Sequence, residues 1–352
     1  MLLLKVLNIT FTRPEAKVTD PHLAADGLKI HSDTIVIDGT CPGEHWQEAF
    51  STWVSGGASA CVVSVAGWES CRETMGRIGE VLRLLRETSE LSLATETADV
   101  RAAKRDGKLA AVLHFQGTGP FEYDLDLAEV YWRLGVRIVQ LAYNVRSPAA
   151  DGCEEPGNAG LSRFGRQLVA ELNRLGIVVD VSHTGHASSM DAVEASTAPS
   201  IASHSNAAAV HPSRRNLQDD LIKAIAAGGG VIGVNGYPAF VADAITPTLD
   251  QYIDHMAYIA DQVGPGHVGI GLDYTNRNPP IAEYEQLIAD GHWSRESYPP
   301  PPWRYPSGLE DASGLPNLTR RLLERGFSEH DVRGILGENW LRVFDAVWGA
   351  DD

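Results

Sequence analysis

Two histidines and one aspartate follow short apolar runs of the chain, at positions where they could bind a metal ion and move protons. His183 comes after the run Ile177–Val181, His204 comes after Ser200–Ala202, and Asp273 follows a third such run. Imidazole nitrogens are common neutral ligands of zinc, and a carboxylate can act as a general base. We therefore expect His183 and His204 to hold one divalent ion with Asp273 beside it. The alternative is a polar network that only caps the end of a sheet.

A further apolar run offers two more polar side chains. His114 and Gln116 lie two residues apart at the end of the run Leu109–Phe115. Successive side chains of a strand point to opposite faces, so these two share one face, and Gln116 lies nearer the carboxyl end. Both are therefore candidates for the metal site.

The elements that position these residues alternate along the chain. Short β-branched runs typical of buried parallel strands recur between amphipathic segments typical of helices. No GxGxxG or Walker motif follows the first run, which argues against nucleotide binding. Eight strands alternating with helices predict an α/β fold, the (β/α)8 TIM barrel, in which the carboxyl ends of the strands meet at one mouth. The predicted strands are Thr34–Ile37, Ala60–Val65, Leu109–Phe115, Ile138–Ala142, Ile177–Val181, Ser200–Ala202, Gly230–Val234 and Val268–Gly271, and the predicted helices include Glu69–Glu87, Leu161–Leu175, Ser188–Ala195 and Leu217–Ala227.

We expect one barrel domain over residues 1–352, because neither an internal repeat nor a low-complexity linker divides the chain. The segment Thr275–Gly308 interrupts the alternation with a long loop that is rich in aromatic residues and proline. Such a loop predicts a substrate cover or an oligomer contact, and a mobile surface loop is the alternative. Ser328–Trp348 has a helix-capping start and an amphipathic pattern. It predicts a helix that closes the bottom of the barrel or meets a second subunit.

The composition indicates a soluble protein with a full hydrophobic core. Of 352 residues, 43% are hydrophobic, and 46 Asp+Glu against 29 Lys+Arg give a net charge of -17. Phosphate backbones and anionic lipids repel so acidic a chain, and we expect no nucleic-acid or membrane partner. No apolar stretch reaches the roughly 20 residues that span a bilayer, and the first residues lack the order of a signal peptide. The four cysteines form no CxxC pair, which favours free thiols and a cytoplasmic location.

Several motifs occur in a distinctive order between the fourth predicted strand and the end of the chain. They are Gly160–Arg166, Asn173–Gly176, Asp180–His183, Ser203–Asn206, Arg214–Asn216 with Asp219 and Asp220, and Gly337–Phe344. With them the chain resembles the membrane (renal) dipeptidase family of metallopeptidases, from about Asp33 to Trp348. The resemblance implies a barrel of the amidohydrolase type, a two-zinc site that hydrolyses dipeptides and related small amides, and a homodimer. Because one fold hosts many functions, the site must be transferred residue by residue.

The resemblance implies roles for five residues that match motifs of the family. His183 and His204 match the histidines of its second metal, and Asp273 matches the aspartate after its last strand. Arg215 matches the arginine that holds the substrate carboxylate, a task suited to a guanidinium because it can donate two parallel hydrogen bonds. Tyr237 falls where the family has a tyrosine in the substrate pocket.

Three sites depart from the family pattern. Thr40 and Pro42 stand where the first strand of the family carries a His-x-Asp pair of metal ligands, and Gln116 stands for the bridging glutamate. A neutral amide can ligate one hard cation, but it lacks the charge that holds two cations close together. Tyr143 replaces a histidine that contacts the reacting carbonyl, and its phenol can still donate to an oxyanion. We assign the adjacent Asn144 to substrate binding.

The combined expectation is a metal-dependent amide hydrolase with one zinc ion as its cofactor and a small carboxylate-bearing amide as its substrate. The two strand-end imidazoles would hold the ion, with Gln116 or His114 as a further ligand. Glu44 and His45 follow the first strand and could stand in for the missing pair. Two alternatives remain: a barrel that binds a small carboxylate without catalysis, and a hydrolase of a non-peptide amide such as a lactam.

Overall fold

Strands and helices alternate through most of the chain, as their apolar patterns predict. The computed structural model describes residues 21–41 and 46–349. Its strands are β1 Ile37–Cys41, β2 Ala60–Ala66, β3 Leu91–Leu93, β4 Leu109–Phe115, β5 Val136–Gln140, β6 Val178–Asp180, β7 Ile232–Val234 and β8 Val268–Ile270. Its α-helices are α1 Pro21–Asp33, α2 Trp46–Ser55, α3 Cys71–Glu87, α4 Thr97–Asp106, α5 Asp126–Arg133, α6 Arg163–Leu175, α7 His186–Ala195, α8 Asp219–Ala227, α9 Pro238–Val241, α10 Leu249–Val263, α11 Ile281–Ala289, α12 Leu315–Glu324, α13 Glu329–Arg333 and α14 Asn339–Trp348.

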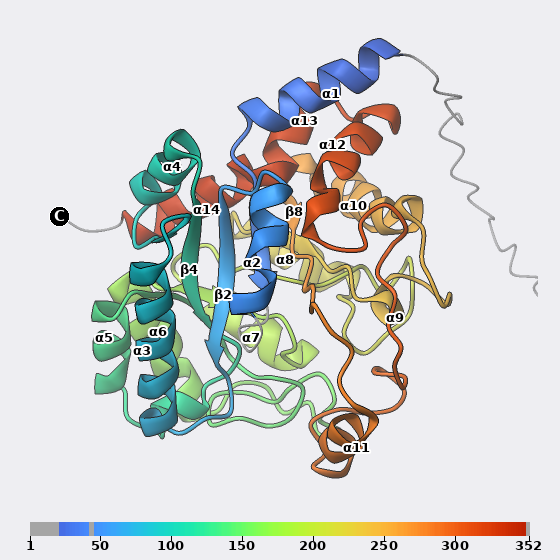
Figure 1. Cartoon of the computed structure of the whole chain (residues 1–352). Coiled ribbons are helices and arrows are strands. Elements are labelled where there is room, and N and C mark those ends of the chain that lie inside the picture. The colour runs from blue at the N-terminus through green and yellow to red at the C-terminus, as the bar shows by residue number, and fades with distance from the viewer. Residues whose placement is uncertain (1–20, 42–45, 350–352) are drawn as a thin grey trace, which may run out of the picture.

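The strands form one parallel sheet with helices packed around it. The strand order is β6-β5-β4-β2-β1-β8-β7, and β3 pairs with β4 beside this path. Single parallel bridges join Asp180 to Ile201 and Ala202 to Ile232, so residues 201–202 connect β6 with β7. In Figure 1, α3, α5 and α6 lie on one side of β2 and β4, and α11 lies at the end of the molecule toward which β2 points. The chain therefore has an α/β fold built on a parallel sheet.

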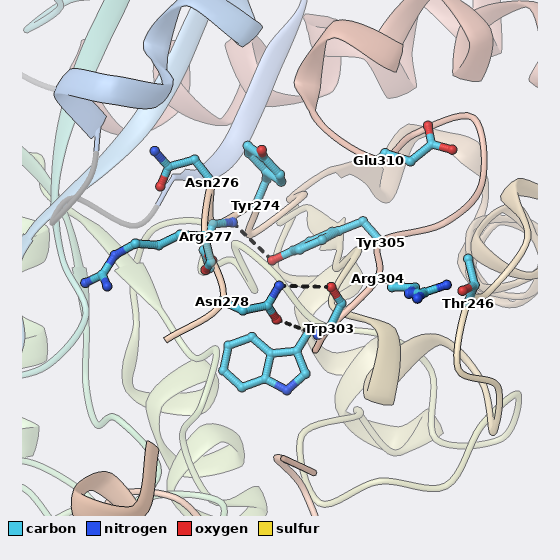
Figure 2. Close-up of a pocket in the computed structure, with 10 residues that line it drawn as sticks. Thr246, Tyr274, Asn276, Arg277, Asn278, Trp303, Arg304, Tyr305 and Glu310 are labelled. Carbon is cyan, nitrogen blue, oxygen red and sulfur yellow. Dashed lines mark hydrogen bonds between the residues drawn. The ribbon is translucent and has the colours of Figure 1, made fainter. Parts of the chain in front are cut away.

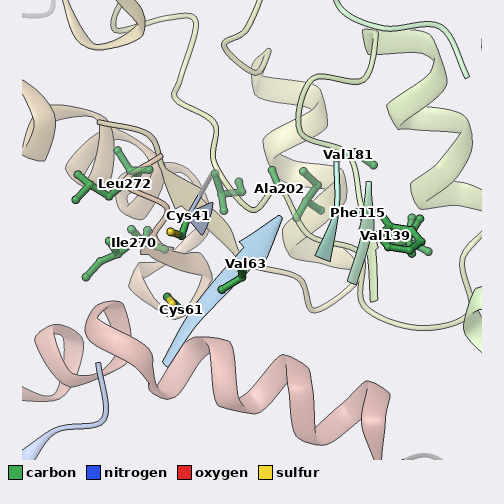
Figure 3. Close-up of a cluster of buried hydrophobic side chains, with 14 of the residues drawn as sticks. Cys41, Cys61, Val63, Phe115, Val139, Val181, Ala202, Ile270 and Leu272 are labelled. Carbon is green, nitrogen blue, oxygen red and sulfur yellow. The ribbon is translucent and has the colours of Figure 1, made fainter. Parts of the chain in front are cut away.

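Buried apolar side chains hold the helices onto the outer face of the sheet. Figure 3 shows part of this cluster, with Cys61 and Val63 from β2, Phe115 from β4 and Val139 from β5. Every residue of β2 and β4 is buried. Because helices cover one face and side chains fill the other, these strands read in the sequence as continuous apolar runs rather than as an alternation.

The C-terminal helix α14 packs the indole of Trp340 against the inner face of the sheet. A Cβ atom built on Gly39, Gly233 or Gly269 would lie 2.6 to 2.9 Å from this indole. These three glycines belong to the neighbouring strands β1, β7 and β8, so a side chain on any of them would push the indole out. Trp340 Nε1 also donates to the carbonyl of Ile270 at 3.2 Å. Figure 1 places α14 at the opposite end of the strands from α11.

Four predicted helices end at the residue where the structure ends them, and serine caps explain where two of them start. Predicted helix ends at residues 87, 175, 195 and 227 coincide with those of α3, α6, α7 and α8, whereas each start differs by two residues. Ser70 Oγ accepts from the amide of Glu73, and Ser162 Oγ accepts from the amide of Gly165, so α3 and α6 begin just after these residues. Ser328 caps α13 through the amide of Asp331, and a π-helical turn over residues 334–338 joins α13 to α14.

Three strand predictions need correction. The first strand is Ile37–Cys41 rather than Thr34–Ile37, because Thr34 Oγ1 bonds back to the carbonyl of Ile30 at the end of α1. The segment Ser200–Ala202 forms only single bridges. The strand β3 was not predicted, because three residues are too few to show a period.

Three further expectations can be set against the described residues. The segment Thr275–Gly308, predicted as an irregular loop, contains the helix α11. None of the four cysteines, all of which lie in the described part of the chain, forms a disulfide bond. Within residues 21–41 and 46–349, no helix combines the length and the apolar character needed to cross a bilayer.

Candidate active site

His183 and His204 form the centre of the site. His183 lies three residues beyond the end of β6, and His204 lies two residues beyond the bridge at Ala202. Their Nε2 atoms are 2.8 Å apart. Only 3% of the His183 surface and none of the His204 surface is exposed. The structure therefore brings together the two histidines that the sequence nominates as metal ligands.

The outer nitrogen of His183 is bound by Asn144. His183 Nδ1 lies 2.7 Å from Asn144 Oδ1, while Asn144 Nδ2 donates to the carbonyl of His292 and to Tyr298 Oη, both at 3.0 Å. Because an amide oxygen only accepts, this network assigns the ring hydrogen to Nδ1 and a lone pair to Nε2. His183 thus directs a lone pair toward His204, in the orientation of a metal-binding imidazole.

Two hydroxyl groups decide the tautomer of His204. Its Nδ1 lies 2.7 Å from Ser203 Oγ and 2.9 Å from Thr40 Oγ1. The Ser203 hydroxyl donates to Asp180 and can therefore accept from Nδ1–H, whereas the Thr40 hydroxyl can donate either to Nδ1 or to its neighbouring backbone carbonyl. When the Thr40 hydroxyl donates to the backbone carbonyl, His204 carries its hydrogen on Nδ1 and both Nε2 atoms carry lone pairs. The two rings then offer two nitrogens to one cation. When the Thr40 hydroxyl donates to His204 Nδ1, the hydrogen of His204 lies on Nε2 and is donated to His183 Nε2.

Both imidazoles are held in their neutral form. The pKa of His183 and that of His204 lie well below the ordinary histidine value, because burial penalises the charged ring and the Arg215 guanidinium adds a positive charge nearby. A second ring hydrogen on either histidine would create the charge that burial opposes. Neutral imidazole is also the form that binds zinc.

His114 lies beside the histidine pair but has other partners. Its Nδ1 is 3.0 Å from Ser64 Oγ, and its Nε2 is 3.2 Å from Asp180 Oδ2. His114 and Ser203 together hold the pKa of the buried Asp180 carboxyl near 2, against the effect of burial. The structure therefore uses His114 to hold Asp180, which in turn accepts from Ser203, rather than placing it with the pair.

The described donors fit one metal ion better than two. Within the ranges 21–41 and 46–349, no three His, Cys, Asp or Glu side chains gather as a metal-binding group. Gln116 lines the pocket next to the pair. Pro42, Glu44 and His45 lie outside the described residues. Two neutral imidazoles without a clustered carboxylate can hold a single cation, but they lack the negative charge that a two-metal centre needs.

Asp273 lies in the pocket wall with a backbone conformation shared by its neighbours in the site. Its φ is 53°, and those of His183 and Asn144 are 58° and 59°. This left-handed region is costly for residues other than glycine, and such residues cluster at functional sites. Burial raises the pKa of the Asp273 carboxyl to about 7, although Arg215 and a 3.1 Å hydrogen bond from Asn235 Nδ2 act against this rise. Asp273 can therefore exchange a proton near neutral pH.

Tyr143 covers one face of His183. The two rings are stacked with centroids 4.0 Å apart and an interplanar angle of 20°. Trp293 Nε1 donates to the Tyr143 hydroxyl at 3.3 Å, so the hydroxyl hydrogen is left for another acceptor. Burial raises the pKa of the phenol, which keeps it protonated. Tyr143 is thus a neutral hydrogen-bond donor at the edge of the histidine pair.

A pocket of about 440 Å³ opens beside these residues. This volume is in the range of small-molecule sites. Tyr143, Asp273, Gln116 and Tyr237 all contribute to it. The Tyr237 hydroxyl is buried without a hydrogen-bond partner. Further lining residues are Ser64, Ala66, Gly67, Trp68, Glu69, Arg77, Thr275, Arg277, Pro279, Glu283, Gln286, Leu287, Trp293, Tyr298 and Trp303.

The segment 275–308 supplies much of this wall and is bound at both ends. Figure 2 shows Asn278 paired with the backbone of Trp303, whose amide donates to the Asn278 side chain and whose carbonyl accepts from it. Tyr305 donates to the carbonyl of Asp273 at 2.6 Å and accepts from the amide of Thr275 at 3.1 Å. A second cavity of about 330 Å³, drawn in Figure 2, shares Thr275, Arg277 and Trp303 with the main pocket. The segment thus covers the site.

Arg215 is buried on another side of the histidine pair. Its Nη2 donates to the carbonyl of His204 at 3.0 Å, and its guanidinium lies 5.3 Å from the ring centroid of Phe240. Its Nε has no hydrogen-bond partner, and no carboxylate in the described part of the chain lies within ion-pair distance. With His183 it lines a cavity of about 130 Å³, separate from the main pocket. A buried cation without an anion is suited to bind one.

The sequence of this chain matches a known protein family. Residues 44–290 and 303–351 match the family model described as membrane dipeptidase, peptidase family M19. The chain belongs to the membrane dipeptidase family. The motif resemblance found in the sequence is thereby confirmed.

Relatives in this family are dipeptidases and an amidohydrolase. Dipeptidase verJ of Clonostachys rogersoniana is 33% identical over 87% of this chain and 70% of that protein. Dipeptidase aclJ of Aspergillus oryzae is 31% identical over 80% of this chain and 62% of that protein. An amidohydrolase structure from Pseudomonas aeruginosa is 36% identical, with a TM-score of 0.87 over 92% of this chain and 99% of that chain. The chain thus spans 62 to 70% of these two curated relatives, and its membership of the family indicates a hydrolase.

Two features of this membrane dipeptidase family site were not found from the sequence. Asn144, which we assigned to substrate binding, is fully buried and uses its amide to hold His183 and Tyr298. The indole of Trp68 lines the pocket, and its surface is 43% exposed. Trp68 follows the end of β2, so its place beyond a strand end was a usable signal.

Proposed function

We propose that this member of the membrane dipeptidase family is a metal-dependent hydrolase of a dipeptide, or of a related small amide, that bears a free carboxylate. The convergence of two neutral imidazoles at 2.8 Å carries the proposal. Ring nitrogens that face one point while their other nitrogens are hydrogen-bonded are typical of metal ligands. One zinc ion is the proposed cofactor, because the described donors supply one pair of imidazoles.

Asp273 is the proposed proton carrier. A zinc ion held by His183 and His204 would supply Lewis acidity and a bound water that ionises near neutral pH. Asp273 lines the adjoining pocket, and the pKa of its carboxyl is about 7. At neutral pH it can accept a proton from the attacking water and return it to the leaving amine.

Tyr143 and Arg215 are proposed to bind the two ends of the reacting group. The Tyr143 hydroxyl accepts from Trp293, so its own hydrogen can be donated to the carbonyl oxygen as negative charge develops there. Arg215 has an unpartnered Nε in a cavity next to His183, where it can bind the substrate carboxylate.

We further propose that the parallel sheet closes into the (β/α)8 barrel. The bridges at Ile201 and Ala202 support closure, because they join the strands at the two ends of the sheet order, β6 and β7. A closed sheet brings the carboxyl ends of all its strands to one mouth, where His183, His204 and Asp273 can act on one substrate.

A second candidate is a binding protein without catalysis. Gln116 and Thr40 favour it, because they replace the charged or imidazole ligands of the family by neutral oxygen donors. Such a protein would keep the pocket and Arg215 but would not ionise a water.

Metal analysis and turnover of one purified protein separate these candidates. We expect about one equivalent of zinc after equilibration with the metal and hydrolysis of carboxylate-bearing dipeptides or lactams, both lost in His183→Ala. His330→Ala is the matched control, because His330 is exposed on α13. Folded wild-type protein that binds dipeptides but neither retains zinc nor hydrolyses any of them would establish the second candidate instead.

A further inference from the structure

The histidine pair lies between two cavities of unequal size. His183 itself lines the smaller cavity of about 130 Å³, which also contains Arg215. Tyr143 is stacked on the His183 ring with centroids 4.0 Å apart, and it lines the larger pocket of about 440 Å³. A substrate whose amide bond reacts at this pair must place one part on each side. The two cavities therefore decide which part can be large.

Aromatic side chains from separate parts of the chain form the wall of the larger pocket. Trp293 stacks on Tyr298 with centroids 4.8 Å apart, and Trp303 meets Tyr237 at 5.1 Å. Trp68 follows β2 and meets the edge of Tyr143 at 4.7 Å. The six lining aromatic residues are Trp68, Tyr143, Tyr237, Trp293, Tyr298 and Trp303. Such a wall offers planar apolar surface for a ring of the ligand.

Both indole nitrogens of Trp293 and Trp303 in this wall are engaged within the protein. Trp293 Nε1 donates to Tyr143, and Trp303 Nε1 donates to the carbonyl of Pro299 at 2.7 Å. Apart from Asp273, the charged side chains of the lining pair with each other: Arg77 lies 2.9 Å from Glu69, and Arg277 lies 3.5 Å from Glu283. With these groups occupied, the wall recognises an uncharged ring by contact rather than a charged chain by ion pairing.

Trp68 provides a surface for stacking at this wall. One face of its indole stacks on His292, with centroids 4.1 Å apart and an interplanar angle of 28°. Even so, 43% of the residue remains exposed. Large indole surfaces left open in a pocket are typical of ligand contacts. Trp68 is therefore the clearest candidate for direct contact with a ligand ring.

The smaller cavity restricts the carboxylate side of the substrate. At about 130 Å³ it is below the roughly 300 Å³ at which ligand pockets begin. Arg214 on its wall lies 3.5 Å from Glu296, so Arg215 is left to bind an anion there. A terminal carboxylate attached to a short residue fits this space, whereas an aromatic residue does not.

We infer that the preferred substrate is a dipeptide with an aromatic amino-terminal residue and a small carboxyl-terminal residue, glycine or alanine. The inference rests on the proposed function, which places the substrate carboxylate at Arg215. The aromatic ring then occupies the larger pocket against Trp68, and the scissile amide lies at His183 and His204.

Two dipeptides of identical composition test the direction of this preference. Binding of Phe-Gly, Gly-Phe and Ala-Gly is measured by titration calorimetry on the full chain carrying Asp273→Asn, in zinc-containing buffer, so that turnover does not interfere. We expect Phe-Gly to bind about tenfold or more tightly than Ala-Gly, because a ring is removed from water. We also expect it to bind more tightly than Gly-Phe. Equal binding of Phe-Gly and Ala-Gly, or tighter binding of Gly-Phe, would overturn the inference.

Substitutions of Trp68 test the wall directly. Trp68→Ala should lose about three- to tenfold of the affinity for Phe-Gly and little of that for Ala-Gly, while Trp68→Phe should recover most of the loss. Trp348→Ala is the control, because Trp348 is a partly buried tryptophan on α14, at the other end of the strands. An unchanged Phe-Gly affinity in Trp68→Ala would contradict the placement of the ring.

Turnover by the wild-type protein separates this inference from the proposed function. Hydrolysis of Gly-Phe and Ala-Gly at rates equal to that of Phe-Gly would leave the hydrolase in place and refute the specificity. Selective binding of Phe-Gly without hydrolysis of any dipeptide would refute the hydrolase and leave the pocket preference in place.

Discussion

Replacing Asn144 by alanine should weaken zinc binding at a histidine that the substitution does not alter. The Asn144 amide accepts from His183 Nδ1–H at 2.7 Å and donates to Tyr298 and to the carbonyl of His292. The residue is fully buried, so water cannot easily replace these bonds. Asn144→Ala therefore leaves the ring hydrogen of His183 without an acceptor and the ring free to rotate or change its tautomer.

The size of the effect follows from the contacts that are lost. A buried donor left without its partner costs about 1–3 kcal/mol, and loss of a group that orients a ligand histidine lowers metal affinity about 10–100-fold. A further cost is local, because Asn144 has a φ of 59°, which alanine adopts at about 1–2 kcal/mol. The variant should thus lose about 2–5 kcal/mol of its free energy of unfolding.

Two companion variants separate the side chain from the backbone. Asn144→Gly removes the same hydrogen bonds but tolerates the left-handed conformation, so it should lose as much zinc affinity as Asn144→Ala while being less destabilised. Asn144→Asp keeps an acceptor and should retain zinc affinity. Zinc affinity is measured by competition with a chromogenic chelator, and stability is measured by guanidinium unfolding. An Asn144→Ala protein that binds zinc as tightly as the wild type would refute the role given to this side chain.

Three further substitutions test other parts of the structure. Asp273→Asn should abolish the fall in kcat/KM that we expect below about pH 7, where the carboxyl is protonated, and a variant that keeps this pH limb would exclude Asp273 as the base. The same change should raise the melting temperature at pH 8, because a folded-state pKa of about 7 against 3.8 means that stability is lost as the pH rises through this interval. Trp340→Ala should cost about 3–5 kcal/mol in guanidinium unfolding, and a loss below about 1 kcal/mol would contradict its packing against the inner sheet face. Thr40→Val keeps Ser203 as the partner of His204 Nδ1 and should leave zinc affinity in a chelator competition unchanged or up to about tenfold higher. A comparable decrease would instead show that the Thr40 hydroxyl is needed to orient His204.

Much of the fold could be predicted, because local pattern and buried surface agree along most of the chain. The ends of four helices and the positions of β2 and β4 follow from apolar periodicity and from glycine or polar residues at their boundaries. Prediction failed where pairing across the sheet decides the structure. The strand β1 runs through the polar residues Asp38 and Thr40, and only its neighbours β2 and β8 make that segment a strand.

By itself, the sequence determined which polar side chains end the parallel strands, and hence that His183, His204 and Asp273 share one end of the sheet. That inference needs only the rule that parallel strands present their carboxyl ends together. The tertiary structure alone decided which partners these side chains have. In the folded chain His114 pairs with Asp180, and Asn144 accepts a hydrogen bond from His183. Arg215 lies in a cavity apart from the aromatic pocket. Such contacts join residues far apart in the chain over a few ångströms, and no local pattern records a distance between segments that only the packed core brings together.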